Sequence, residues 1–219
     1  MSKKLNLLKR IIIFFIGMTI IQFGVALYVR TNIGSDPFTV FTQGISLLLN
    51  VSIGQANMII LASLITVIFF VGRNHINIGT LICVIGVGPV IDFGVKLSSY
   101  FEIESLSFGL KILVVVLGCI LIAIGFSILS ASKMGVAPND IVPFIIQERT
   151  NYQYKWIRIG LDSVLFVIGG VLLKGVYGIG TIISLLLTGP FIHICLPYGE
   201  KLVSLIIKDD FELESKTAL

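Results

Sequence analysis

Residues 78–92 read IGTLICVIGVGPVID, and a closely related stretch, IGTIISLLLTGPFIH, occupies residues 179–193. The second stretch begins 101 positions after the first (179 against 78). The same offset, without a gap, pairs Gly17 with Gly118, Gly24 with Gly125, Gly34 with Gly135 and Pro37 with Pro138. A similarity that keeps one offset over most of a chain indicates an internal duplication. We therefore expect two structurally equivalent halves.

The composition places both halves in a membrane. Hydrophobic residues make up 56% of the chain and charged residues 13%, and the mean hydropathy is +1.02, whereas soluble domains carry about 25% charged residues. The net charge of +4 comes from Lys and Arg residues between apolar runs, where they act as determinants of membrane topology. We therefore predict an integral protein of the lipid bilayer, and we exclude nucleic acid as a partner.

The motifs that usually carry enzyme or cofactor chemistry are not found in a sensible context. These are the Walker, Rossmann, HExxH, CxxC and nucleophile-elbow patterns. Cys83, Cys119 and Cys195 are widely spaced in apolar segments, which fits neither a disulfide framework nor a metal-ligand spacing. We expect the cysteines to be small buried hydrophobic residues, and we expect no cofactor, no metal and no enzyme activity.

Six apolar stretches approach the length of about 20 residues that a helix needs to cross a bilayer core of about 30 Å. They are residues 11–29, 56–72, 76–95, 110–129, 156–173 and 179–196. Two further segments, 37–50 and 138–150, contain 14 and 13 residues and would rise only about 20 Å as helices. Each begins with Pro, and Ser35 and Asp36 precede the first as capping candidates. We predict short or re-entrant helices there.

The distribution of basic residues sets the orientation. With six spans and a cytoplasmic N-terminus, only Arg30, Lys96, Lys111 and Lys174 of the 16 Lys and Arg residues lie outside, as the positive-inside rule favours. Eight spans would give the same ratio, so segment length rather than charge favours six. We predict a multi-pass protein of the cytoplasmic membrane with both termini in the cytoplasm and the loop around Glu102 outside.

Each copy then comprises one span, a short helix and two more spans. An odd number of crossings inverts the second copy relative to the first. We therefore predict an all-α membrane protein of six transmembrane helices in two inverted three-span repeats, residues 1–104 and 105–208, followed by a charged cytoplasmic tail, residues 209–219. Many secondary transporters have inverted repeats with sites near the bilayer midplane. The alternative is a duplicated bundle that transports nothing.

The dipeptides Gly88-Pro89 and Gly189-Pro190 lie at equivalent positions in the third span of each copy. Each Gly is ten residues from the expected helix start, about 15 Å along the axis and near the bilayer middle. Proline leaves the carbonyl four residues before it without its helical donor. One interpretation is a kink or an unwound turn whose exposed carbonyls serve a central site. The other is a kink satisfied by neighbouring helices, with Gly serving close packing.

Asp92 and His193 follow the two prolines at equivalent positions. Ionisable residues inside a membrane are costly when they face lipid, and they usually mark a pathway or a pair. Inversion would separate these two by roughly 12 Å along the axis. We therefore expect successive proton or cation sites rather than a direct pair, and a neutral, satisfied His193 is the alternative. Asp162 lies four residues after Arg158, which predicts a structural ion pair on one helical face.

Polar residues also mark the starts of several predicted helices. Gly-Thr pairs at 79–80 and 180–181 open the third span of each copy. The Thr hydroxyl can cap a helix, and the exposed amides of a helix start could instead bind an anionic group. Asn139 and Asp140 lie at the start of the second short helix, where we expect them to make polar contacts.

At these residues the chain resembles the YczE-like (YczE/YyaS/YitT) bacterial integral membrane proteins over nearly its whole length. The resemblance rests on the Gly-x-x-Pro turn at 34–37, the Gly-Thr pair at 79–80 and the Gly-Pro-x-x-Asp run at 88–92. The turn commonly reads Gly-x-x-Pro-Trp-Asp in the family. Here the first copy has Phe-Thr after the Pro, and only the second copy keeps the acidic residue, as Asp140. The resemblance implies a polytopic protein of the cytoplasmic membrane and leaves its activity open.

Two functional hypotheses follow. The first is a secondary transporter or permease for an unidentified small molecule or ion, with a midplane site between inverted repeats. The candidate substrate-binding residues are Gly88, Pro89, Asp92, Gly189, Pro190, His193, Asn139 and Asp140. The alternative is a membrane scaffold or an accessory subunit of a membrane-associated complex, which would use the amphipathic run 201–208 or the charged tail 209–216 as an interaction surface.

Overall fold

The computed structural model describes residues 3–207, and no strand occurs in that range. The α-helices are α1 (Lys3–Thr31), α2 (Pro37–Leu49), α3 (Ile53–Gly72), α4 (Ile78–Ser98), α5 (Phe108–Ala131), α6 (Pro138–Thr150), α7 (Tyr154–Phe166) and α8 (Ile179–Ile206). The 3-10 turns η1 (Arg73–His75), η2 (Ser99–Phe101) and η3 (Ile103–Ser105) follow α3 and α4, and a π-helical turn, η4 (Val167–Leu172), follows α7. The predicted tail, residues 209–219, lies outside the described residues.

Five helices within the described residues are long and apolar enough to cross a membrane. They are Leu5–Thr31, Ile53–His75, Ile78–Phe101, Phe108–Ala131 and Ile179–Ile206, and they coincide with five of the six predicted spans. The remaining predicted span, the fifth in chain order (residues 156–173), is divided into the 13 residues of α7 and the 6 residues of η4, and it is not among the five. The π-helical turn interrupts its regular hydrogen bonding, and Arg158 and Asp162 reduce its apolar character. The protein is thus an all-helical membrane protein with five candidate spans.

The two short helices are present, each with 13 residues. The Asp36 carboxylate accepts a hydrogen bond of 3.1 Å from the Thr39 amide, which satisfies a free donor of the first turn of α2. Pro37 supplies the fixed φ that suits a first helical position. Asn50 and Asn151 end α2 and α6 in the left-handed conformation, which is typical of a helix C-terminus.

Helices α1 and α5 cross at positions where both helices have glycine. A Cβ at Gly17 would lie 2.7 Å from the Leu129 amide nitrogen and 2.8 Å from the Gly125 oxygen, and one at Gly24 would lie 2.8 Å from the Gly118 oxygen. Small residues allow membrane helices to approach this closely. Displacing the Gly17–Gly125 contact by the 101-residue offset gives the Gly118–Gly24 contact, so the crossing contains the same contact twice.

Two backbone hydrogen bonds repeat with the same offset. The Gly79 amide donates to the Met134 oxygen at 3.0 Å, and the Gly180 amide donates to the Ile33 oxygen at 2.9 Å. The first bond ties the start of α4 to the segment before α6. The second ties the start of α8 to the segment before α2. Each half therefore holds the segment that precedes the short helix of the other half.

The predicted caps at the Gly-Thr pairs are confirmed. The Thr80 hydroxyl accepts a hydrogen bond from the Asn77 amide at 3.4 Å and donates to the Val136 oxygen at 2.9 Å. The Thr181 hydroxyl accepts from the Gly178 amide at 3.3 Å. Both hydroxyls thereby serve the first turns of α4 and α8.

The cysteines are free. Cys83 is buried in the main apolar cluster with Phe14 of α1 and Leu61 of α3. Cys119 is also buried and accepts a hydrogen bond of 3.0 Å from the Tyr28 hydroxyl. These positions agree with the predicted role of the cysteines as small hydrophobic residues, whereas Cys195 is only partly buried.

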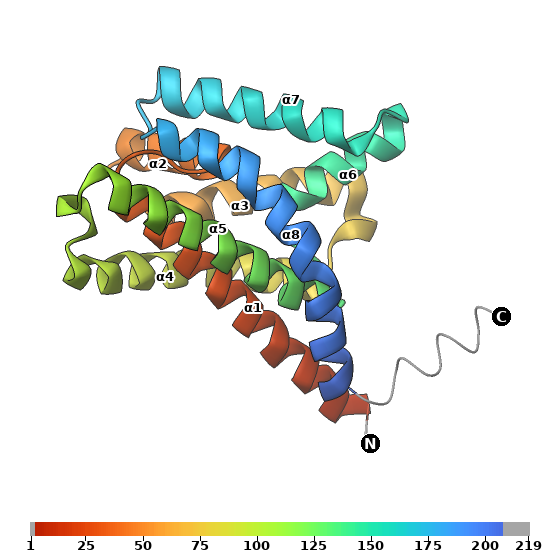
Figure 1. Ribbon diagram of the computed structural model, residues 1–219. Coiled ribbons are helices and arrows are strands. Elements are labelled where there is room, and N and C mark those ends of the chain that lie inside the picture. The colour runs from red at the N-terminus through yellow and green to blue at the C-terminus, as the bar shows by residue number, and fades with distance from the viewer. Residues whose placement is uncertain (1–2, 208–219) are drawn as a thin grey trace.

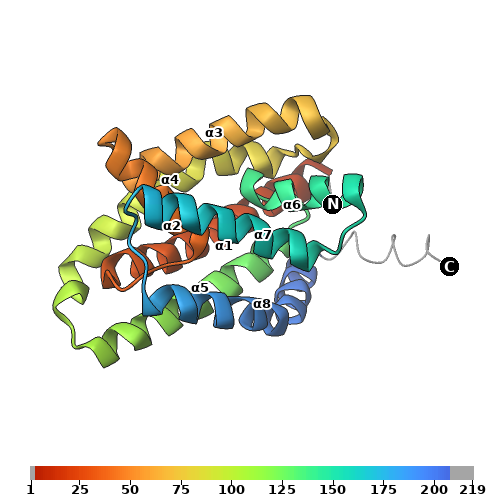
Figure 2. The same cartoon turned by 90° about the horizontal axis from the view of Figure 1, so that it is seen from above.

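The helices pack in two groups. The first group contains α1, α4, α5 and α8, and the second contains α2, α3, α6 and α7 with η4. The principal contact between the groups is that of α3 with α4. Helices α7 and α8 make no comparable contact and lie apart in both views (Figure 1 and Figure 2). The α3–α4 pair of the first half is therefore packed together, whereas the equivalent α7–α8 pair of the second half is not.

Candidate functional site

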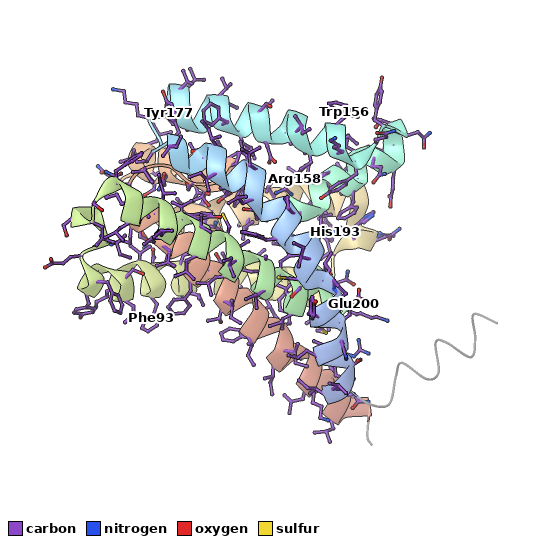
Figure 3. All side chains as sticks on the ribbon, in the orientation of Figure 1. Phe93, Trp156, Arg158, Tyr177, His193 and Glu200 are labelled. Atoms are coloured by element: carbon purple, nitrogen blue, oxygen red, sulfur yellow. The ribbon has the colours of Figure 1, made fainter. Side chains whose placement is uncertain are left out.

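A charged network joins α6 to α7. The Arg158 guanidinium donates to Asp140 at 2.9 Å and to Asp162 at 3.2 Å. The three side chains are 36%, 24% and 19% exposed in the order Arg158, Asp140, Asp162. Figure 3 shows Arg158 on the side of α7 that faces the other helices, whereas Trp156 projects from the opposite side. The Arg158–Asp162 pair confirms the prediction from spacing, and Asp140 is an additional partner.

The local structure of α6 places this second partner. Pro138 starts α6, so Asp140 lies in the first turn, where a carboxylate is favoured by the helix dipole. The Asn139 side-chain amide donates to the Asp140 carboxylate at 3.3 Å. Asn139 and Asp140, two of the predicted site residues, therefore belong to the network around Arg158.

The start of α2 approaches the same network. Asp36 lies close enough to Asp162 to interact with it electrostatically. One oxygen of Asp36 already caps α2, and no cation pairs with it in the described ion pairs. Asp140 of α6 and Asp162 of α7 thus contact the Arg158 guanidinium, and the Asp36 carboxylate before α2 adds a third negative charge near Asp162. The attraction between these opposite charges offsets only part of the cost of removing the charged side chains from water. The cluster also carries an excess of negative charge.

Four side-chain polar atoms are buried without a hydrogen-bond partner in the described part of the chain: Asn6 Oδ1, Arg30 Nε, Ser35 Oγ and Asn57 Oδ1. Two of these residues, Asn57 and Ser35, are 5% and 0% exposed. Ser35 directly precedes Asp36, and Asn57 has the position in the first half that Arg158 has in the second. An unsatisfied buried polar group costs about 1–3 kcal/mol, and such groups are often kept at functional positions.

Asp92 and Gly88 have other contacts. The Asp92 carboxylate accepts hydrogen bonds from the Ser52 hydroxyl at 2.5 Å and the Gly54 amide at 2.8 Å, so it binds the N-terminus of α3 to the side of α4. Gly88 packs against Met58 and Gly54 of α3. Both predicted site residues therefore hold α3 against α4.

Their equivalents in the second half lack these contacts. An added Cβ at Gly189 would have no atom within 4 Å, and Pro190 and His193 lie on an exposed face of α8. Pro89 is also exposed. Helices α4 and α8 continue through both prolines, so the chain is not unwound there, and a substrate contact of the carbonyls that the prolines free stays a prediction.

Two of these contacts were not predicted from the sequence: that of Arg158 with Asp140, and that of Asp92 with the start of α3. A signal for the Arg158–Asp140 contact existed, because Arg158 is the one basic residue of the predicted fifth span and Asp140 is the acidic residue at the start of the preceding short helix. The cap that Asp92 provides had no such signal. It depends on α3 lying beside α4, which spacing within either helix does not reveal.

Comparison with known proteins agrees with the predicted resemblance. The family described as "Family of unknown function (DUF6198)" matches residues 8–197. The chain is 29% identical over 204 residues to "Uncharacterized membrane protein YczE" of Bacillus subtilis (strain 168), covering 92% of each chain. It is 26% identical over 189 residues to "Uncharacterized protein YyaS" of the same organism, covering 85% of this chain and 92% of the relative. An "Uncharacterized protein" of Haemophilus influenzae is 24% identical over 175 residues, with 80% and 78% covered. No solved structure matches. The chain therefore belongs to the DUF6198 family of YczE-like membrane proteins.

Proposed function

We propose that the protein is a secondary transporter or permease of the cytoplasmic membrane. The observation that carries this proposal is the network of Asp140, Arg158 and Asp162 among apolar helices. A charged side chain at the centre of a membrane helix costs about 2.5–3.5 kcal/mol on insertion scales. Such residues are usually kept where they serve a substrate or ion pathway.

The proposal includes an inverted-repeat architecture with six crossings. The paired contacts of the glycines in α1 and α5, and of Gly79 and Gly180, support it because each contact recurs with the halves exchanged. In this architecture α7 and η4 form the sixth crossing. Their 19 residues, 13 and 6, would rise about 28 Å as a regular helix, close to the thickness of a bilayer core.

The two short helices supply a second line of support. Secondary transporters commonly direct the ends of discontinuous helices at a midplane site. Here Asp36 caps the N-terminus of α2 and interacts electrostatically with Asp162, and Asp140 lies in the first turn of α6 and pairs with Arg158. Three carboxylates against one guanidinium favour a positively charged substrate or coupling ion.

The scaffold alternative has less support. Its candidate surfaces were the run 201–208 and the charged tail 209–216, of which residue 208 and the whole tail lie outside the described residues. Val203 and Ile207 of that run are buried against Ile13 of α1. Two apolar residues of the run therefore stabilise the bundle and are not available to a partner.

A ligand screen tests the proposal. Purified wild-type protein is heated with inorganic cations and protonated amines, because a ligand of the native state raises the apparent stability, by about 2.7 kcal/mol at one hundred times Kd. A compound that stabilises the wild type is then tested for uptake into proteoliposomes. We expect Asp140→Asn to lose both the stabilisation and the uptake.

The matched control is Glu104→Gln. Glu104 also pairs with an arginine, Arg30, at 2.7 Å, but it lies in the loop between α4 and α5. We expect this variant to behave like the wild type. Equal stabilisation and equal uptake in Asp140→Asn and the wild type would contradict a site at the Arg158 network.

A further inference from the structure

The two halves differ in one helix contact. In the first half, Gly54 and Met58 of α3 pack against Gly88 of α4. In the second half, Gly189 replaces Gly88, and no atom comes within 4 Å of an added Cβ. Helix α7 (Tyr154–Phe166) has no buried residue. The surface that receives α3 on α4 is thus repeated on α8 without a helix against it.

The second helix group is bound internally at both ends. On one side, the Arg149 guanidinium of α6 donates to the Val71 oxygen of α3 at 2.6 Å, and His75 lies 3.1 Å from Glu148. On the other side, the Val176 amide, beyond the end of η4, donates to the Gln43 side chain of α2 at 3.1 Å. Helices α2, α3, α6 and α7 therefore form one unit rather than four independent helices.

The connections from the first group into this unit have the geometry of hinges. Gly34 and Gly135 precede α2 and α6 with φ of +112° and +105°, a region that glycine enters freely and other residues rarely adopt. The reciprocal bonds of Ile33 and Met134 hold the residues just before them. These two related positions are fixed points about which the unit can turn.

We propose that the unit of α2, α3, α6 and α7 rocks between two arrangements. In the arrangement described above, α3 is closed on α4 and α7 is parted from α8. In the other, α7 is closed on α8 and α3 is parted from α4. Applying the 101-residue offset to the α3–α4 contact generates the second arrangement. Packed interfaces of this kind change between discrete states rather than deforming continuously.

Three substitutions between the halves explain which arrangement is populated. Lys155 stands where Gly54 stands in the first half, so α7 lacks the glycine that allows α3 to approach the backbone of α4 closely. His193 and Gln153 replace the bonded Asp92 and Ser52, so the second half lacks the carboxylate cap. The α3–α4 contact is the tighter one, and its main polar clamp is Asp92.

Spin-label distances test this inference without a substrate. One pair of labels is placed at Ile59 and Ile85, and the equivalent pair is placed at Gly160 and Leu186. Ile59, Ile85 and Leu186 are 45%, 69% and 66% exposed, and Gly160 has open space around it. We expect Asp92→Ala to lengthen the first distance and to shorten the second in the same fraction of molecules. Glu104→Gln is the control and should change neither.

Two results would overturn the rocking motion. One is an unchanged pair of distances in Asp92→Ala. The other is a longer Ile59–Ile85 distance with no change between Gly160 and Leu186, because α3 would then move without α7.

Crosslinking provides a second measurement. In a background without the natural cysteines, Gln153→Cys with His193→Cys should crosslink within one chain. A minor state of about 0.1–10% makes this crosslink about 10- to 1000-fold slower than it would be in a permanently closed pair, and adding Asp92→Ala should accelerate it. The control pair, Gln153→Cys with Leu186→Cys, should not react. Crosslinks between two chains would show that a second copy covers α8 and would overturn the inference.

The inference rests on the inverted repeats of the proposed function, but it can fail separately. Static distances would leave the ligand-binding proposal in place, because the screen and the uptake assay do not measure motion. Conversely, a rocking protein that binds no cation at the Arg158 network would contradict only the proposed substrate class and site.

Discussion

Arg158 is the residue on which the charged network depends, because its guanidinium contacts carboxylates on two helices, Asp140 of α6 and Asp162 of α7. Removing Asp162 leaves the guanidinium paired with Asp140. Removing Arg158 leaves the Asp140 and Asp162 carboxylates without their cation. The two changes therefore differ in cost even though they break the same Arg158–Asp162 bond.

We predict that Arg158→Leu lowers the stability more than Asp162→Asn does. Arg158→Leu should lower the free energy of unfolding by about 1–2 kcal/mol. This value is below the 3–5 kcal/mol of a fully buried pair, because the guanidinium is about one-third exposed and partly screened. Adding Asp140→Asn and Asp162→Asn to Arg158→Leu should recover most of the stability that Arg158→Leu loses. Thermal unfolding in detergent measures these differences. Equal losses for Arg158→Leu and Asp162→Asn would argue against the shared guanidinium.

At this scale the sequence predicted only what spacing within one helix can reveal. The four-residue separation of Arg158 and Asp162 predicts their pair. Asp140 is 18 residues from Arg158, and its contact requires the chain to turn back between α6 and α7. The predicted residues Asn139 and Asp140 reach the network, whereas Asp92 is bound to α3.

The α1–α5 crossing is the element contact with the least room for change. The Cβ of any larger residue at Gly17 would meet backbone atoms of α5 at 2.7 Å and 2.8 Å, and backbone cannot move aside as a flexible side chain can. The equivalent contact at Gly24 and Gly118 doubles this constraint.

We predict that Gly17→Leu destabilises the protein by at least the 1–3 kcal/mol typical of overpacking, because the added side chain forces α1 and α5 apart. Gly109→Leu is the control, since a Cβ at Gly109 meets no atom within 4 Å. The melting temperatures in detergent measure the difference. A melting temperature of Gly17→Leu equal to that of Gly109→Leu would contradict the close crossing.

The positions of the helices could largely be predicted from the sequence, but which helices pack against one another could not. Apolar length and Pro positions predicted α2, α6 and five of the spans, because these features act within each segment. Repeat periodicity also predicted equal positions for Gly88 and Gly189. It did not predict that α3 packs against Gly88 whereas Gly189 has open space beside it, because that difference comes from the packing of whole helices.

For the whole molecule, the central question is whether α7 and η4 cross the membrane. With a cytoplasmic N-terminus, six crossings return the C-terminus to the cytoplasm. If only the five candidate spans cross, α8 exits on the opposite side. The inverted repeat, the proposed site and the rocking motion all require the sixth crossing.

The most direct test is the location of the end of α8 relative to the N-terminus. Paired fusions place a fluorescent reporter that folds only in the cytoplasm, or a phosphatase active only outside it, after Ile207, with matching fusions before α1 and near Glu104. Six crossings predict fluorescence at both ends of the chain and phosphatase activity at Glu104. Phosphatase activity after Ile207, with the N-terminus fluorescent, would contradict the six-crossing inverted repeat.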